Sequence, residues 1–257
     1  MPYRIRKGEG LGEAFQRILA EETARAAEES ACAAHSRDQA IHQLRKRCKR
    51  VRGLLSLYRE ILGLAATGTD RKIRDYSRSL AGTRSEAALA EIAHRFRLTT
   101  FQSATPDETE LPPTDVALIV PLLTQVASFC GPLAMKTVRN DLLRGIRKIS
   151  NRSKKAWTIA THSPTTAHLH RWRTQVKTHW YATRLTQDLD FGKTGSSRKQ
   201  LARLGEGLGI HHDLSIILDR FAGEGRSADD PDRRRARKLR KQIARRMLQL
   251  GSRVYSK

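Results

Sequence analysis

Four basic side chains recur along one stretch of the chain at the spacing of a helix face. His42 is followed by Arg45, Lys49 and Arg52 at offsets of three, seven and ten residues. In an α-helix, which rises 1.5 Å per residue, they form a ladder of cations about 15 Å long. An arginine binds two phosphate oxygens at once, and a lysine acts as a point charge. Because such a ladder repels itself, it needs either solvent or an extended anion beside it.

The same ladder occurs a second time. His170, Arg173 and Lys177 repeat the spacing, and 170 − 42, 173 − 45 and 177 − 49 all equal 128. The offset continues without a gap, so that residues 80–85 (LAGTRS) correspond to residues 208–213 (LGIHHD). This pattern predicts an internal duplication, in which the chain consists of two copies of one helical unit.

The first ladder is predicted to lie on an amphipathic helix over residues 41–58. Apolar side chains recur there every three or four residues and form a face almost opposite the cations. A helix that opens at residues 8–12 and ends near Ala34 should precede it. Ser36 with Gln39 forms a capping box at the start of the ladder helix.

Further helices are expected after the first ladder. The sequence predicts a turn at residues 65–70, a third helix that Asp70 caps and that ends near Gly82, and a short helix from Ser85 to about Phe96. No segment shows the alternation of a β-strand. The expected fold class is therefore all-α.

Prolines and glycines set the remaining expected boundaries. A loop or linker is expected at 97–114, then a helix start or kink at Pro121, and then a helix that Pro132 opens and that ends near Ala160. The second ladder helix should run from Ser163-Pro164 to about Leu189, followed by a turn at 191–197. The last expected elements are a helix from about 196 to 208 followed by Gly209, a helix that Asp213 caps, and a basic helix opened by Asp230-Pro231. We expect a single domain over 1–257 with halves of about 1–160 and 161–257. Their boundary should lie near residues 161–166, or within the preceding helix.

The charge of the chain restricts its partners. Lysine and arginine number 49 against 26 aspartates and glutamates, which gives a formal charge of +23. This excess predicts a polyanionic partner: nucleic acid, an anionic membrane or polyphosphate. No run approaches the ~18 apolar residues of a membrane span, and the N-terminus lacks the apolar core of a signal peptide. We therefore expect a cytoplasmic protein without a membrane partner.

The cysteines and histidines do not predict a metal site. Cys32, Cys48 and Cys130 are far apart, which excludes a zinc knuckle and a disulfide framework. The first two lie among apolar positions, so we expect buried free thiols. Adjacent residues such as those at 211–213 (His-His-Asp) rarely point at one ion, and Asp213 is better explained as a helix cap. No metal or other cofactor is expected.

Taken together, these features resemble the CHAD domain, the "conserved histidine α-helical domain". The resemblance is based on the two His-x-x-Arg-x-x-x-Lys ladders, the LAGTRS and LGIHHD segments about 30 residues after them, the opening EGLGEAFQRILAEE and the closing LGSRVY. It covers nearly the whole chain.

The resemblance implies a fold, a ligand and a set of binding residues. The family has two four-helix bundles related by a pseudo-twofold, with a basic cleft or pore between them that binds inorganic polyphosphate, often at polyphosphate granules. Carried over to this sequence, the implied binding residues are His42, Arg45, Lys49 and Arg52 in the first half and His170, Arg173 and Lys177 in the second, with Lys46, Arg74, Arg78, Arg144, Arg147, Arg203 and His212 as further candidates.

The second copy departs from the first. Trp180 stands opposite Arg52 in place of a last basic residue, and Thr174 and Thr178 stand opposite two further cations of the first copy. Ser85 stands where the family commonly has an acidic residue. The second ladder should therefore contribute less charge. The acidic Glu-x-Glu-x-Lys signature of the triphosphatase domain to which this family is sometimes fused is absent, which indicates a protein that is not an enzyme.

Other interpretations of the same residues stay open. A charge run on a helix is often a solvated face, and the net charge alone fits a nucleic-acid binder, although aromatic residues are scarce and no named motif is present. A polyphosphate-processing enzyme would need acidic groups to hold Mg²⁺, whereas the ladders supply only cations. His42 and His170 are either neutral hydrogen-bonding residues within a bundle or donors to phosphate. Surrounded by cations, they should be hard to protonate until an anion binds.

Overall fold

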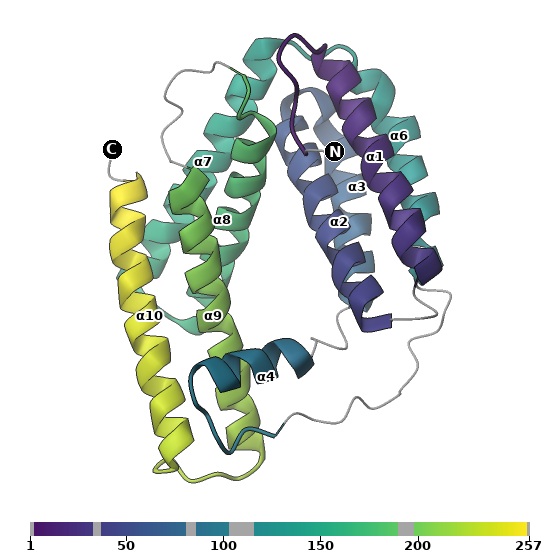
Figure 1. Ribbon diagram of the computed structural model, residues 1–257. Helices are drawn as coiled ribbons and strands as arrows, with labels where there is room; N and C mark the ends of the chain where they lie inside the picture. Colours follow the sequence, from purple (N-terminus) through teal and green to yellow (C-terminus); the bar gives the residue numbers. More distant parts are fainter. Residues whose placement is uncertain (1–2, 33–36, 81–85, 103–115, 190–197, 256–257) are drawn as a thin grey trace. The chain divides into compact units, whose positions relative to one another are not determined.

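The described part of the chain is entirely helical. The computed structural model describes residues 3–32, 37–80, 86–102, 116–189 and 198–255, and within these ranges it contains nine α-helices and no strand (Figure 1). The predicted all-α class is confirmed. Within the described ranges, no helix is both long enough and apolar enough to span a membrane.

The helices group into two compact units. Residues 1–83, 108–150 and 181–194 form the first unit, and residues 84–107, 151–180 and 195–257 form the second. Two long helices, α7 (Arg139–His162) and α8 (Thr166–Leu185), contribute residues to both units. Each unit is described below by itself.

The first unit is built from four helices that pack in a ring, in addition to its parts of α7 and α8. They are α1 (Leu11–Ala31), α2 (Arg37–Leu57), α3 (Arg59–Ser79) and α6 (Ile119–Ala134). Helix α1 packs against α2 and α6, and α3 packs against the same two helices. The apolar periodicity of each helix therefore points into a common core.

Aromatic side chains organise the core of the first unit. The Phe15 and Tyr58 rings meet edge to face with their centroids 5.0 Å apart, and the Tyr58 hydroxyl donates a hydrogen bond to the Leu11 carbonyl over 2.6 Å. Leu44 and Leu55 of α2 are fully buried. The apolar face of α2 therefore faces the core, as its periodicity predicts.

The second unit contains α4 (Glu86–Arg95), α9 (Arg198–Gly223) and α10 (Pro231–Tyr255) with its parts of α7 and α8. Helix α9 packs along α10 and also contacts α4. Trp172 of α8 is fully buried in one apolar cluster, and Phe221 of α9 is fully buried in another.

The predicted turn at residues 65–70 is wrong, because α3 runs through it. The hydroxyls of Thr67 and Thr69 donate to the carbonyls four residues earlier, so they are satisfied within the helix. The break in the helix lies instead at Gly63, whose φ of 55° favours glycine. Asp70 consequently lies inside the helix and is not its cap.

Three further corrections are of the same kind. Pro132 lies in the last turn of α6 and does not open a helix; its missing N–H leaves one hydrogen bond of that turn unmade, and the helix ends two residues later. Helix α8 starts two residues after the predicted proline, because the Thr165 hydroxyl accepts a hydrogen bond from the His168 amide over 3.2 Å and caps it. Gly209 and Asp213 both lie inside the continuous helix α9, where the buried Leu208 and Leu214 favour the helix over the break.

Other predicted boundaries have mixed outcomes. The cap at Asp230 is confirmed, since its carboxylate accepts a hydrogen bond from the Arg233 amide over 2.8 Å. Helix α6 begins two residues before Pro121, which occupies its first turn. Cys48 is buried as predicted, but Cys32 is exposed because it caps the end of α1. The predicted features that lie outside the described residues are Gly82, the caps at Ser36 and Ser85, the turn at 191–197 and most of the linker at 97–114.

Candidate anion-binding site

The first ladder lies on α2, in the first unit. His42, Lys46 and Lys49 are exposed, and Arg45 and Arg52 are half-buried. The helix positions these side chains through its opposite face, which is buried in the core. The structure thus brings all five predicted residues of this helix to one accessible surface, about three turns long.

The first ladder is electrostatically unfavourable without an anion. Desolvation lowers the pKa of His42, and the positive charges of Lys49, Lys46 and Arg45 lower it further. Partial burial likewise lowers the pKa of Arg45. The charged forms of His42 and Arg45 are therefore less favourable here than in water, although Arg45 remains a cation, and a negative charge placed beside the ladder is attracted by several cations at once.

One cation of the ladder already has a carboxylate partner. The Arg52 Nε atom lies 2.7 Å from an oxygen of Asp70 on α3, and both side chains are partly exposed. This ion pair reduces the charge that Arg52 offers to an added anion. This pair lies at the end of the ladder.

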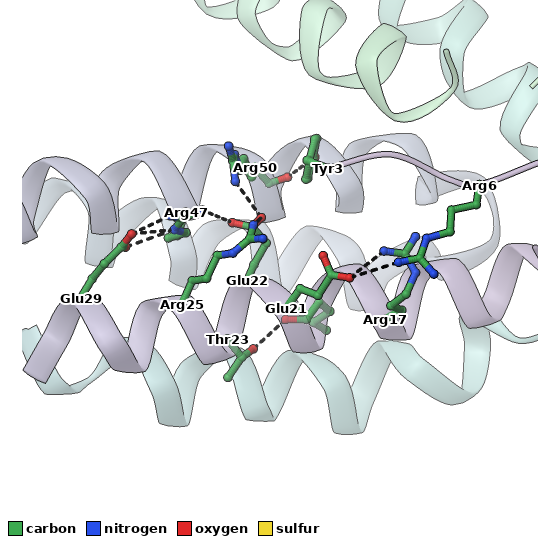
Figure 2. A network of polar contacts seen from close by, with 11 residues as sticks. Tyr3, Arg6, Arg17, Glu21, Glu22, Thr23, Arg25, Glu29, Arg47 and Arg50 are labelled. Carbon is green, nitrogen blue, oxygen red and sulfur yellow. Dashed lines mark hydrogen bonds and ion pairs between the residues drawn. The ribbon is translucent and has the colours of Figure 1, made fainter. Parts of the chain in front are cut away.

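Sequence reasoning missed the role of two arginines on the other side of α2. Arg47 and Arg50 are almost fully buried and point toward α1, where Arg47 bonds both Glu22 and Glu29 and Arg50 bonds Glu22 over 2.9 Å (Figure 2). The Tyr3 hydroxyl also donates to the Arg50 carbonyl over 2.6 Å. These arginines orient α2 against α1. The seven-residue spacing of the two glutamates, which places them on one helix face, is the signal that indicates such pairing.

The second ladder lies on α8 in the second unit and faces α9. A Cβ atom built on Gly205 would lie only 3.2 Å from the Lys177 side chain, and one on Gly209 would lie 3.8 Å from Arg173 Nε. These glycines therefore leave room for the ladder side chains along α9. The His170 and His212 rings lie with their centroids 4.5 Å apart, so that His212 lies beside this ladder.

The second ladder is more enclosed than the first. Burial lowers the pKa of Lys177, the Arg173 charge lowers it further, and Glu206 opposes the shift. The Lys177 ammonium lies 6.0 Å from the centroid of the Trp180 ring. The hydroxyls of Thr174 and Thr178, which lie 128 residues after Lys46 and Arg50, donate to carbonyls of their own helix.

The remaining predicted binding residues lie in several places. Arg74 and Arg78 of α3 both lie near the Asp75 carboxylate, at 3.7 and 3.6 Å. Arg144 forms an ion pair with Asp141 one turn earlier in α7, and Arg147 is exposed on the same helix. Arg203 lines a separate groove of the second unit, described below.

The described residues contain no group of three or more histidine, cysteine, aspartate or glutamate side chains that could hold a metal ion. His211, the first residue of the His-His-Asp segment, is buried, and its pKa falls to about 4 because of that burial and the nearby Arg240. Asp213 lies on the same helix. The ladders themselves supply guanidinium, ammonium and imidazole groups, which are donors to anions.

A family model of the CHAD domain matches residues 13–222. The chain belongs to the CHAD domain family. The match includes both ladders, whereas α10 lies beyond its end. Searches with the chain gave no matching curated protein and no matching solved structure. CHAD membership confirms the resemblance derived from the ladders and is consistent with polyphosphate binding in general.

Proposed function

We propose that this CHAD domain protein binds inorganic polyphosphate through its two cationic ladders, without catalysing a reaction. One observation supports this most strongly: the same histidine, arginine and lysine spacing occurs on the accessible face of α2 and on α8. A merely solvated face has no need of the same three residue types at the same steps twice. A flexible chain of phosphates supplies one negative charge for each cation in turn.

The physical basis of binding is charge-assisted contact. Each arginine or lysine that meets a phosphate forms hydrogen bonds stronger than neutral ones and displaces counterions from the polymer. Desolvation, and then the charges of the neighbouring cations, lower the pKa of His42 in the free protein, and a bound anion offsets the second of these effects. The cleft between two bundles that the resemblance implies, and the association with granules, stay part of this proposal.

The test removes one arginine from each ladder. Arg45→Gln combined with Arg173→Gln should weaken binding of long-chain polyphosphate at least about a hundredfold, because two charge-assisted contacts are lost, each of about 1.5–3 kcal/mol. Dissociation constants are measured by calorimetry at fixed salt. The matched control is Arg234→Gln with Lys238→Gln, which removes the same charge from two exposed positions on α10. An equal loss in the control would mean that net charge, and not the ladders, binds the polymer.

The principal alternative is a nucleic-acid binder. The net charge of +23 attracts any polyanion, so competition decides between the two ligands. Polyphosphate should stay bound in the presence of duplex or single-stranded DNA at equal phosphate concentration. If DNA displaces it completely, nucleic acid becomes the better assignment. Release of phosphate from polyphosphate by the pure protein with Mg²⁺ would instead indicate an enzyme.

A further inference from the structure

The second unit holds an arginine-lined groove apart from the second ladder. Its volume is about 620 Å³, and it is bounded by α4, α9 and α10. Arg95 of α4, Arg203 of α9, and Arg246 and Arg253 of α10 all line it. A groove of this size accommodates a small organic ligand, since ligand pockets in proteins span roughly 300–1,000 Å³.

The groove has a large excess of positive charge. Four guanidinium groups line it against one carboxylate, that of Glu206, and all four arginines are exposed. Among the described residues, none of these four forms an ion pair. Arg246 and Arg253 are seven residues apart, so their backbone positions lie about 10 Å from each other along the helix. This spacing suits an anion that carries several phosphates.

The floor of the groove differs from the surface of a ladder. Gly207 and Ile210 of α9 and Met247 and Leu250 of α10 line it, so that apolar surface lies between the arginines. A linear polyphosphate has no apolar part to cover this floor. A phosphorylated molecule with a planar ring does, because the ring can lie on the apolar side chains while the phosphates reach the guanidinium groups.

Helix geometry separates the groove from the second ladder. Gly205 and Gly209 of α9 lie against Lys177 and Arg173. Arg203 precedes Gly205 by two residues, which rotates it by about 200° around the helix at 100° per residue. Arg203 and the second ladder therefore lie on opposite sides of α9, although Glu206, which lines the groove, also interacts with Lys177.

We propose that this groove is a second anion site, which binds a nucleotide-sized ligand composed of a phosphate chain and an aromatic ring. The arginines bind the phosphates, and the floor made by Gly207, Ile210, Met247 and Leu250 contacts the ring. The site can be tested separately from the polyphosphate proposal, because Arg246 and Arg253 lie outside both ladders and beyond the matched family range.

The experiment compares ATP with inorganic tripolyphosphate, both without added Mg²⁺. Titrations use the full chain carrying Arg45→Gln and Arg173→Gln, so that the ladders compete weakly for either probe. ATP should bind at least fivefold more tightly than tripolyphosphate, because only ATP covers the apolar floor. Adding Arg246→Gln and Arg253→Gln should weaken ATP binding at least twentyfold, whereas adding Arg234→Gln and Lys238→Gln should change it less than threefold.

Three outcomes would overturn the assignment. Tripolyphosphate binding as tight as ATP would show that the floor contributes nothing. An equal loss of ATP binding from the Arg234 and Lys238 changes would show that only net charge matters. Retention of ATP binding after the Arg246 and Arg253 changes would place the nucleotide elsewhere. A separate measurement uses Arg246→Gln and Arg253→Gln in the otherwise native chain. The dissociation constant for long-chain polyphosphate should stay within twofold of the native value. Failure of the groove proposal is therefore distinct from failure of the ladder proposal.

Discussion

Individual arginines of α2 serve two different purposes according to the side of the helix on which they lie. Arg47 and Arg50 are buried against Glu22 and hold α2 to α1, whereas Arg45, on the ladder face, is half-buried among other cations. Breaking a buried pair leaves an uncompensated charge inside the protein, so substitutions at Arg47 or Arg50 report on folding. Substitutions at Arg45 are the ones that report on binding.

His42 should make polyphosphate binding depend on pH. Its pKa is lowered in the free protein by desolvation and by Lys49, Lys46 and Arg45, so the ring is largely neutral at pH 7. A bound polyanion raises this pKa, and the complex then takes up a proton. Affinity should therefore increase as the pH falls from about 8 to 6, near the reference pKa of about 6.5.

The measurement is a series of dissociation constants for long-chain polyphosphate across this pH range. Replacement of His42 by glutamine should reduce the pH dependence while leaving the affinity at pH 8 within about twofold, because the ring is neutral there. Arg234→Gln is the control and should keep the full pH dependence. A dissociation constant that does not vary with pH in the native chain would remove the histidines from the binding mechanism.

The residues of the ladders could be predicted from the sequence because their spacing is regular and repeated. The place of Arg203 could not, since residue spacing within α9 does not say which neighbouring helix a side chain meets. Packing of α9 on α10 brings Arg203 to the groove with Arg246. The pairing of Arg52 with Asp70 could not be predicted for a related reason. The sequence suggests that Asp70 caps a helix, whereas in the structure its side chain forms an ion pair with Arg52 of α2.

At the scale of helices, apolar periodicity correctly predicted that most segments are helical. Residues that often end helices, such as glycine and proline, led to wrong predictions of where the helices begin and end. The segment at 65–70 and the region around Gly209 contain glycine and look like turns, yet both are helical. A glycine inside a helix costs only about 1 kcal/mol relative to alanine, which burial of neighbouring leucines readily outweighs. The proline at position 132 likewise marks the end of α6 and not the start of another helix.

Close helix packing in the first unit should make one glycine irreplaceable. A Cβ atom on Gly145 of α7 would lie 2.2 Å from the Leu57 carbonyl oxygen at the end of α2, where backbone cannot move aside cheaply. Gly145→Ala should therefore lower the free energy of unfolding by about 3 kcal/mol, at the upper end of overpacking effects. Urea unfolding followed by circular dichroism measures this change.

Gly68 in α3 provides the matched control. A Cβ atom there meets nothing within 4 Å, and the residue lies inside a helix. Gly68→Ala should raise the stability by about 0.5–1 kcal/mol, because alanine loses less backbone freedom on folding. If both variants shift the unfolding midpoint in the same direction, the close approach of α7 to the end of α2 is not what constrains Gly145.

At the scale of the whole molecule, the formal charge of +23 acts on every polyanion at long range and sets no register. It speeds encounter and favours non-specific association, and both effects weaken as salt screens the charge. The contribution of the ladders differs from that of the net charge, because the ladders place cations in fixed positions on α2 and α8. The salt dependence of the association constant separates the contribution of the ladders from that of the net charge. Each cation that contacts a phosphate in the complex releases counterions, so the salt dependence increases with the number of such contacts.

The logarithm of the polyphosphate association constant should fall linearly with the logarithm of the salt concentration. Each cation that contacts a phosphate contributes about 0.7–0.9 to the slope, by analogy with nucleic acids. Arg45→Gln with Arg173→Gln should reduce the slope by about 1.5, because two such contacts disappear. Arg234→Gln with Lys238→Gln lowers the net charge by the same amount but should leave the slope unchanged, since these exposed residues of α10 lie off the ladders. Equal reductions in both double variants would show that the polymer is bound by overall charge, and that the duplicated spacing of histidine, arginine and lysine has no part in recognition.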